Sequence, residues 1–256
     1  MEPGLVALVT GVSRNRGIGA HVARALAADG WDLALTGWPP YDQAMPWGSD
    51  TDDRERLDAE LAAWGRRSVR LDADLADPDG PRSVFDWAEA ALGPITALVV
   101  VHTHDTGGGL ADITAADFDR HMAINVRSTL LLAAEFARRF TGDQSRGRVV
   151  TFTSVLPLVG SIAYAASKGA VEWITVSAAA ELAARGITVN AVNPGPTDTG
   201  WMSPDLDARI RSQTPLGRIG QPGDAADLVA FLCSERGGWI TGQVLTSDGG
   251  WSTLRG

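Results

Sequence analysis

The chain has 256 residues, of which 45% are apolar and 21% are charged, the ordinary balance of a globular protein. This length allows a sizeable hydrophobic core, and we expect one domain over residues 1–256, because no low-complexity linker or internal repeat divides the sequence. A formal net charge of −9 and a pI near 4.9 argue against nucleic acid as a partner, since phosphate binding needs a basic surface.

The single cysteine, Cys233, cannot form a disulfide within the chain. The N-terminal residues lack the basic region and the long apolar run of a signal peptide. No stretch approaches the ~18 consecutive apolar residues that a membrane-spanning helix needs. These features predict a cytoplasmic protein without a membrane partner.

Short apolar runs alternate with longer helical patterns along the chain. The strand candidates are Leu5–Val9, Leu33–Thr36, Val69–Leu71, Ala97–Val101, Val149–Thr153, Thr188–Val192 and Val244–Thr246. Their near-continuous apolar character is typical of strands buried on both faces. The repeated strand-helix-strand units predict a doubly wound α/β fold, with a parallel sheet of about seven strands and helices on both faces.

Several helix starts are recognisable. Asp77–Pro78 and Ser203–Pro204 each place a capping residue before a proline at the first helical position, and Thr114–Asp117 resembles a capping box. The least regular stretch is Trp38–Asp52, whose prolines and lack of periodicity predict a long loop. Because it follows the second strand, this loop is expected at the edge of the sheet where cofactors bind.

A glycine-rich turn over Thr10–Gly19 joins the first strand to the first helix. In such a turn, backbone N–H groups can approach a pyrophosphate at the positive end of the helix. Glycines also serve ordinary turns, and the position after the first strand of a doubly wound pattern is what favours a nucleotide site. The candidate residues are Gly11, Ser13, Gly17, Ile18 and Gly19.

Arg14 and Arg16 within this turn bear on the choice of cofactor. An acidic residue after the second strand would bind a free ribose hydroxyl, whereas a basic residue nearby would accommodate a 2′-phosphate. This chain has Trp38 after the second strand and no acidic residue there. The sequence therefore favours NADP(H) and leaves NAD(H) open. The alternative is that both arginines are solvated loop charges. Asp74 and Leu75 follow the third strand and are candidates to contact the adenine, or else form a solvated loop or helix entry.

Lys168 is the only lysine among 22 basic residues, and it lies four residues after Tyr164. In a helix this spacing places the phenol and the ammonium on one face. A nearby ammonium favours the phenolate, so the pair predicts a Tyr164 pKa below its usual value of about 10. An arginine would replace this compact charge poorly. The pair therefore predicts an acid/base device.

Several features in order along the chain together resemble the short-chain dehydrogenase/reductase family. They are the Thr10–Gly19 turn, Asn125 in a long helix, Ser154 after the fifth strand, Tyr164 with Lys168, and the segment Asn193–Thr199. The resemblance covers nearly the whole chain and is strongest to bacterial reductases similar to 3-oxoacyl-carrier-protein reductase. It implies a Rossmann-type fold and a homo-oligomer, a tetramer or a dimer, formed through the helices that carry Asn125 and Tyr164.

The resemblance also implies site roles. Tyr164 would exchange a proton with the substrate oxygen, and Lys168 would lower the Tyr164 pKa and bind the nicotinamide ribose. Ser154 would orient the carbonyl oxygen, and Asn125 would anchor a water that links Lys168 to solvent. Considered alone, Asn125 could instead bridge backbone groups within its helix, and Ser154 could be a strand-end turn residue. The nicotinamide end would lie against Pro194, Gly195, Thr197 and Thr199, with Thr199 at its carboxamide.

Three departures from the family pattern stand out. Gly11 and Gly17 are six residues apart where the family usually has four. The fourth strand reads Val100–Thr103 in place of Asn-Asn-Ala-Gly, which predicts the loss of hydrogen bonds that brace the central strand. Ser154 precedes Tyr164 by ten residues where thirteen is usual, so either Ser154 or one of two neighbouring threonines, Thr151 and Thr153, supplies the hydroxyl.

Two histidines follow the fourth strand, near where a substrate could enter. His102 and His104 are either an extra acid/base group or bystanders, and their spacing does not indicate a metal site.

The leading hypothesis is an NADP(H)-dependent enzyme that interconverts a ketone and a secondary alcohol on a small or carrier-bound substrate, without a metal. A second hypothesis keeps the fold and changes the reaction to an isomerisation, dehydration or cyclisation. The third is a non-catalytic nucleotide-binding protein. The presence of Asn125, Ser154, Tyr164 and Lys168 argues against the third, because a binding module has no need of all four.

Overall fold

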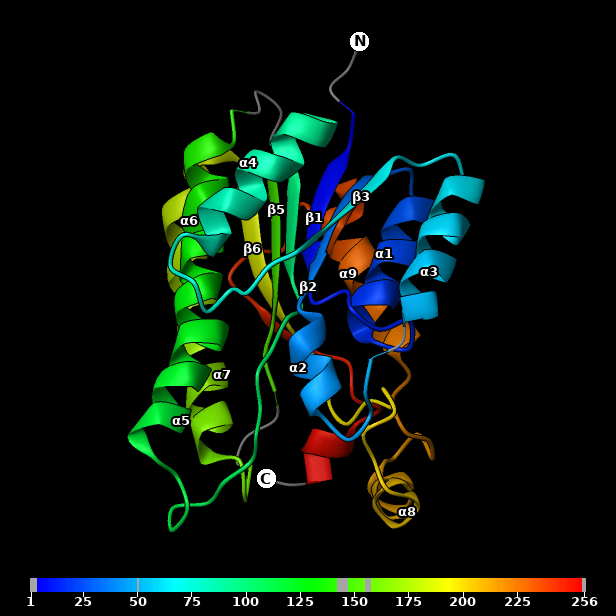
Figure 1. Ribbon diagram of the computed structural model, residues 1–256, viewed down its shortest axis with the longest axis vertical. Helices are drawn as coiled ribbons and strands as arrows, with labels where there is room; N and C mark the ends of the chain where they lie inside the picture. The colour runs from blue at the N-terminus through cyan, green and yellow to red at the C-terminus, as the bar shows by residue number, and fades with distance from the viewer. Residues whose placement is uncertain (1–3, 50, 142–146, 155–157, 255–256) are drawn as a thin grey trace.

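A computed structural model describes residues 4–49, 51–141, 147–154 and 158–254. Its centre is a seven-stranded sheet in the order β3-β2-β1-β4-β5-β6-β7, with every neighbouring pair parallel (Figure 1). The strands are β1 (Val6–Thr10), β2 (Asp32–Gly37), β3 (Ser68–Asp72), β4 (Ala97–Val100), β5 (Gly147–Phe152), β6 (Ile187–Asn193) and β7 (Val244–Thr246). All predicted strands are present, so the doubly wound parallel fold is confirmed.

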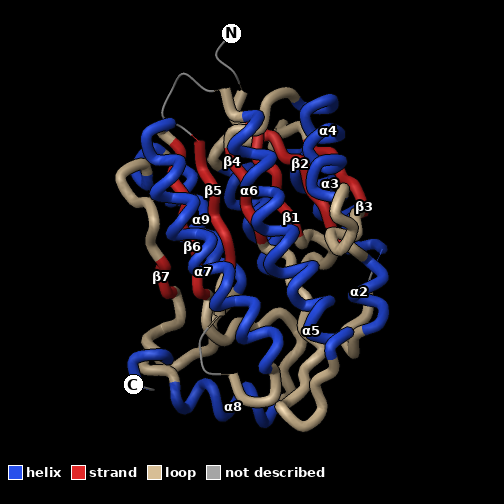
Figure 2. The backbone as a smooth tube through the Cα atoms, turned by 90° about the vertical axis from the view of Figure 1, so that its left-hand side faces the viewer, coloured by secondary structure: helices blue, strands red, loops and turns tan. Residues whose placement is uncertain are grey.

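The helices cover both faces of this sheet. They are α1 (Ile18–Ala28), α2 (Pro39–Ala44), α3 (Thr51–Ala63), α4 (Gly80–Leu92), α5 (Ala115–His121), α6 (Ser128–Arg139), α7 (Ile162–Leu182), α8 (Pro204–Gln213) and α9 (Pro222–Cys233). A π-helical turn, Met122–Arg127, joins α5 to α6, and α6 and α7 run side by side (Figure 2). Within the described ranges, none of the helices is both long and apolar enough to cross a membrane.

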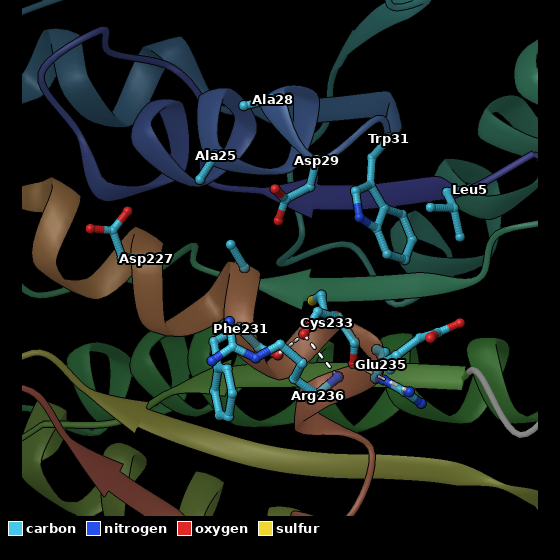
Figure 3. A pocket seen from close by; sticks show the side chains of 13 residues that line it. Leu5, Ala25, Ala28, Asp29, Trp31, Asp227, Phe231, Cys233, Glu235 and Arg236 are labelled. Carbon is cyan, nitrogen blue, oxygen red and sulfur yellow. Dashed lines mark hydrogen bonds between the residues drawn. The ribbon is translucent and has the colours of Figure 1, made fainter.

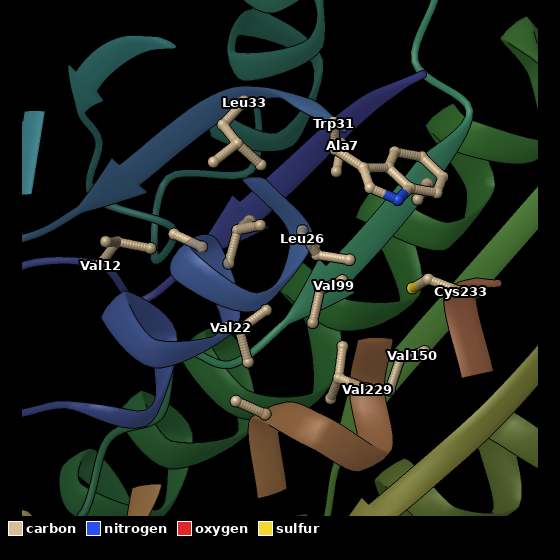
Figure 4. Close-up of a cluster of buried hydrophobic side chains, with 14 of the residues drawn as sticks. Ala7, Val12, Val22, Leu26, Trp31, Leu33, Val99, Val150, Val229 and Cys233 are labelled. Atoms are coloured by element: carbon tan, nitrogen blue, oxygen red, sulfur yellow. The ribbon is translucent and has the colours of Figure 1, made fainter. Parts of the chain in front are cut away.

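The hydrophobic core lies on the two faces of the sheet, because successive side chains of a strand point in opposite directions. Ala7 and Val9 of β1 belong to the cluster that packs against α1 and α9 (Figure 4). Val6 and Leu8 of the same strand belong to the cluster on the other face, against α4, α6 and α7. Burial on both faces explains why the strands read as continuous apolar runs.

Two of the predicted helix starts are confirmed and one is wrong. Ser203 caps α8, and the Thr114 side chain accepts a hydrogen bond from the Asp117 N–H in a capping box. However, no helix begins at Pro78. An Asp77 carboxylate oxygen accepts from the Asp79 N–H at 2.9 Å, and this turn delays the start of α4 to Gly80, where Pro81 enters the first turn.

The prediction of a long loop over Trp38–Asp52 is also wrong. Pro39 and Pro40 occupy the first turn of α2, where a missing N–H costs no hydrogen bond, and α3 begins at Thr51. The six residues of α2 are too few to show a helical periodicity in the sequence. As a result, α2 lies beyond the carboxyl end of β2, beside the predicted cofactor site (Figure 1).

Candidate active site

The glycine-rich turn packs so closely against backbone that side chains would not fit at two of its glycines. Gly11 has a φ of +74°, and a Cβ there would lie 2.6 Å from the backbone nitrogen of His102, just after β4. A Cβ on Gly19 would lie 2.5 Å from the Gly11 carbonyl oxygen. Gly17 precedes α1 and offers no side-chain cap to the first helical N–H groups. Open backbone donors at the start of a helix suit a pyrophosphate, so these residues fit a dinucleotide.

Ser13 and Ile18 are the other two candidate residues of this turn. A Cβ on Gly37, at the end of β2, would lie 3.1 Å from the Ser13 nitrogen, so the turn rests closely on β2. Ile18 is partly buried against the hydrophobic cluster on the α1 face. The turn is therefore anchored to the sheet at both ends.

The two arginines of the turn, both predicted to bear on the choice of cofactor, lie in different directions. Arg14 Nε is 3.3 Å from a carboxylate oxygen of Asp42 in α2. Arg16 donates to Asp198, in the loop after β6, at 2.7 Å. Arg16 is thus directed toward the segment expected at the nicotinamide end, and only Arg14 is on the side of β2. Asp42 is a site residue that the sequence alone did not reveal, because α2 was not predicted.

Trp38, Asp74 and Leu75 lie at the same edge of the sheet, and their contacts differ. Trp38 is half-buried and precedes α2. Asp74 accepts from the Ala76 N–H at 2.9 Å, so one of its oxygens stabilises a local turn. Leu75 is buried in the core. The neighbouring Ala73 N–H donates to the Gly37 carbonyl oxygen at 3.0 Å and ties this segment to the end of β2.

Tyr164 and Lys168 share one face of α7, as their spacing predicted. The Lys168 Nζ is 5.5 Å from the centre of the Tyr164 ring. It is buried and donates to the Phe152 carbonyl oxygen, at the end of β5, at 2.9 Å. The side chains of Ser154 and Thr103 both lie near enough to Tyr164 to lower its pKa. The end of β5, the segment after β4 and the start of α7 therefore meet at the phenol.

Neither threonine proposed as a substitute for Ser154 is directed at Tyr164. Thr153 donates to a Glu172 carboxylate oxygen at 2.7 Å, and the Oγ1 atoms of Thr151 and Thr175 lie 2.8 Å apart. Ser154 is thus the hydroxyl residue of the three that contacts the phenol. Residues 155–157, within the shortened connection to Tyr164, lie outside the described residues.

The prediction that Lys168 gives Tyr164 a low pKa is wrong for this structure. Burial raises the pKa of Tyr164 to about 12, and hydrogen bonds from Ser154 and Thr103 offset only part of that rise. Burial also lowers the pKa of Lys168 to about 8, opposed by the Asp105 carboxylate. At neutral pH the phenol is protonated and Lys168 is mostly charged.

Asn125 connects the segment after β4 to α7. Its side-chain oxygen accepts from the His104 N–H at 2.7 Å, and its amide donates to the His104 carbonyl oxygen and to Ser167 Oγ, both at 2.9 Å. Ser167 Oγ in turn donates to the Tyr164 carbonyl oxygen at 2.7 Å. Asn125 therefore bridges two distant segments rather than groups within its own helix.

His102 replaces the hydrogen bonds that the altered fourth strand was predicted to lose. Thr10 Oγ1 accepts from the N–H groups of Val101 and His102, so its own proton is directed at His102 Nδ1, 2.7 Å away. Nε2 then carries the ring proton and donates to the Ile124 carbonyl oxygen at 3.0 Å. Burial lowers the pKa of His102 to about 4, so the ring is neutral. The brace between β1, β4 and the π-helical turn is kept.

A second group of aromatic side chains surrounds His104. Its ring lies 5.4 Å from the Tyr41 ring and 4.8 Å from the His121 ring, and burial lowers its pKa to about 4. The Tyr41 hydroxyl donates to the Asp105 carbonyl oxygen at 3.1 Å. Asp105 also accepts from Ser161 Oγ, just before α7, at 3.2 Å. Through Asp105, this group connects α2 to the segment after β4 and to the start of α7. The sequence did not predict it, because its members come from distant segments.

The predicted nicotinamide segment follows β6 at the same edge of the sheet. Gly195 has a φ of +59°, and a Cβ there would lie 2.3 Å from the Asp248 Cβ. Thr197 Oγ1 donates to the Pro194 carbonyl oxygen at 3.2 Å, and the Thr199 N–H donates to the Thr197 carbonyl oxygen at 3.0 Å. These contacts hold Pro194, Gly195, Thr197 and Thr199 in one compact turn.

A pocket of about 700 Å³ lies away from this group, between α1, α9 and the start of β1 (Figure 3). Its lining includes Leu5, Trp31, Arg148 and the buried Cys233, whose pKa is raised to about 12 by burial. The lining contains none of the predicted site residues. The carboxyl edge of the sheet is therefore the candidate active site.

Known proteins match almost the whole chain. The sequence model of the family described as "Enoyl-(Acyl carrier protein) reductase" matches residues 11–252. The uncharacterized oxidoreductase YjdA of Bacillus subtilis is 39% identical over 250 residues, covering 96% of each chain. An NADPH-dependent aldehyde reductase-like protein of Arabidopsis thaliana, described as chloroplastic, is 34% identical, covering 97% of this chain and 94% of the relative.

Solved structures agree with these matches. A short-chain dehydrogenase of Burkholderia cenocepacia J2315 in complex with NADP is 37% identical, with a TM-score of 0.86 and coverage of 97% of this chain and 98% of that one. A blue fluorescent protein from a metagenomic library, in complex with NADPH, is 35% identical, with a TM-score of 0.85 and the same coverage. Sequence and structure lead to one conclusion: the chain is an oxidoreductase that belongs to the short-chain dehydrogenase/reductase family.

Proposed function

We propose that the enzyme interconverts a ketone and a secondary alcohol with NADP(H), and that Tyr164 is the acid/base. The observation that carries this proposal is the meeting of Tyr164, Ser154 and Lys168 at the edge of the sheet where the glycine-rich turn leads into α1. A bound nicotinamide would supply or accept the hydride. The chain's own residues hold the reactants, exclude water and handle the proton.

The proton chemistry follows from the local contacts. With a pKa raised to about 12, the Tyr164 phenol is protonated at neutral pH and can donate to a carbonyl oxygen as negative charge develops there. The Ser154 hydroxyl, which lies beside the same phenol, would hold that oxygen in reach. The buried Lys168 would offset the developing charge and contact the nicotinamide ribose. Asn125 fixes Ser167 and the segment after β4, and so keeps α7 in place.

Several observations support NADP(H) over NAD(H). Arg14 lies on the side of β2, and the position directly after β2 is Trp38 rather than an acidic residue. One relative is described as NADPH-dependent, and two similar structures hold NADP or NADPH. A small or carrier-bound keto substrate is compatible with the same site.

We expect Tyr164→Phe to test the mechanism most directly. Loss of the phenolic proton should lower turnover by a factor on the order of 10² to 10⁴ in NADPH-linked reduction of a carbonyl panel, monitored by absorbance. NADPH affinity, measured by calorimetry, should change little. Near-normal turnover in this variant would exclude Tyr164 as the acid/base. Product formation by the wild type without net NADPH consumption would favour the non-redox alternative.

We also propose a homo-oligomer formed through α6 and α7. Leu130, Trp173 and Val176 are exposed apolar residues on these two helices. Burial of such residues against a second copy would remove apolar surface from water. Gel filtration with light scattering should give the mass of a dimer or tetramer, and Trp173→Glu should lower it. A wild-type mass of one chain would contradict this proposal.

A further inference from the structure

Arg14, the residue expected at a 2′-phosphate, is already engaged by a carboxylate of the same chain. Its Nε lies 3.3 Å from Asp42 Oδ1, and the Asp42 side chain is only 8% exposed. Asp42 is in the first turn of α2, a helix that lies beyond the end of β2. A buried ionised carboxylate needs such a partner, because it is costly to remove from water unpaired.

Trp47 holds this pair in place. Its indole N–H donates to the same Asp42 oxygen at 2.9 Å. The Arg14 guanidinium carbon lies 4.9 Å from the centre of the Trp47 ring, within cation-π distance. Asp42 is therefore oriented toward Arg14 by a second, independent contact.

Arg16 provides the contrast within the same turn. Its side chain is 61% exposed, and its partner Asp198 belongs to the loop after β6. The Arg16 pair thus lies on the side of the turn opposite to α2. A charge change at Asp198 would act at a different part of a bound dinucleotide than a charge change at Asp42.

The two cofactors differ in charge at the ribose 2′ position, which the proposed function places beside Arg14. A 2′-phosphate carries close to two negative charges and would compete with Asp42 for the guanidinium, while a free ribose hydroxyl is neutral and can donate to a carboxylate. We propose that Asp42 is a specificity-determining residue, a built-in competitor that lowers the affinity for NADP(H) relative to NAD(H). This inference rests on the proposed use of a nicotinamide dinucleotide.

Calorimetry with NADPH and NADH on the full chain tests the proposal. Asp42→Asn removes the charge and keeps an oxygen that can accept from Trp47. We expect this variant to bind NADPH roughly fivefold to tenfold more tightly, because like charges close together cost binding free energy, and NADH with nearly unchanged affinity. The same comparison with 2′-phospho-ADP-ribose and ADP-ribose would reproduce the shift without the nicotinamide.

Two further variants show whether the effect passes through Arg14. Arg14→Gln should weaken NADPH binding, and adding Asp42→Asn to that background should no longer tighten it. Asp198→Asn is the matched control, because it removes a carboxylate from the other arginine of the turn. It should shift NADPH and NADH affinities together and leave their ratio unchanged.

The outcomes separate this inference from the proposed function. If the wild type binds neither NADPH nor NADH, the proposed function fails. If both bind and the affinity ratio stays constant or moves toward NADH in Asp42→Asn, the assignment of Asp42 alone is overturned. Asp42→Ser, which also removes the charge, should repeat the result if Asp42→Asn does not fold, as judged by circular dichroism.

Discussion

The two ends of the site are built differently. At the catalytic end, Asn125, Ser167 and Lys168 are all buried. Asn125 and Lys168 each donate to the backbone of another segment, and Ser167 accepts from Asn125. At the glycine-rich turn, Arg14 and Arg16 pair with carboxylates from other elements. A buried polar group must have its hydrogen bonds satisfied in the fold, whereas an arginine can exchange a carboxylate partner for a phosphate and keep its charge paired. The catalytic end is therefore fixed, and the turn can adapt to charge.

Replacement of Lys168 tests the catalytic end of the site, and we expect it to have the largest effect of the changes considered below. Lys168→Met retains much of the side-chain length but removes the ammonium, and we expect carbonyl reduction to slow by a factor on the order of 10² to 10⁴. In the wild type, kcat/KM for reduction should fall as the pH rises through about 8, because Lys168 loses its proton there. The pH profile of the variant should lack this step. An unchanged step would assign it to another group.

Replacement of His102 should have an intermediate effect, and it should lower the stability of the fold rather than the rate of the reaction. His102→Phe keeps an aromatic ring but removes the acceptor of the Thr10 hydroxyl proton, while the Ile124 carbonyl oxygen still accepts from Ser128 Oγ. We expect the free energy of unfolding in urea to fall by about 1–3 kcal/mol. His102→Asn, which restores an amide able to bond Thr10, should recover part of this loss.

The same residue predicts a pH dependence of stability. The folded-state pKa of His102 is about 4, below the value of about 6.5 expected in the unfolded chain, so the unfolded state binds the extra proton between these values. Stability should be full above pH ~6.5 and fall as the pH drops toward 4, with His104 acting in the same direction. The slope should be smaller in His102→Phe. An equal slope in both proteins would exclude His102 as a contributor.

Breaking the exposed ion pair between Arg16 and Asp198 should have the smallest effect. Arg16→Gln breaks the contact with Asp198, and because the arginine is solvated we expect the free energy of unfolding to change by less than ~1 kcal/mol. Affinities for NADPH and NADH should change by the same factor, because Arg16 lies away from Asp42. A selective loss of NADPH affinity would place the 2′-phosphate at Arg16 and remove the difference between the two arginines.

Much of the fold could be predicted because its signals are local. Val6–Thr10 and the other strands read as apolar runs, and the caps at Thr114 and Ser203 act within a few residues. The failures also have local causes. Asp77 began a turn rather than a helix, and α2 is too short for its periodicity to show.

The sequence by itself determined the family, the order of the strands along the chain, and the helix face that Tyr164 and Lys168 share. It could do so because motif spacing and periodicity are properties of the chain. The tertiary structure decided the rest. Burial of Tyr164 raises its pKa, and residue spacing along the chain does not reveal burial. Contacts between distant segments place His102 beside Thr10 and Asp42 beside Arg14. Charge balance at the site is set by which elements the fold brings together.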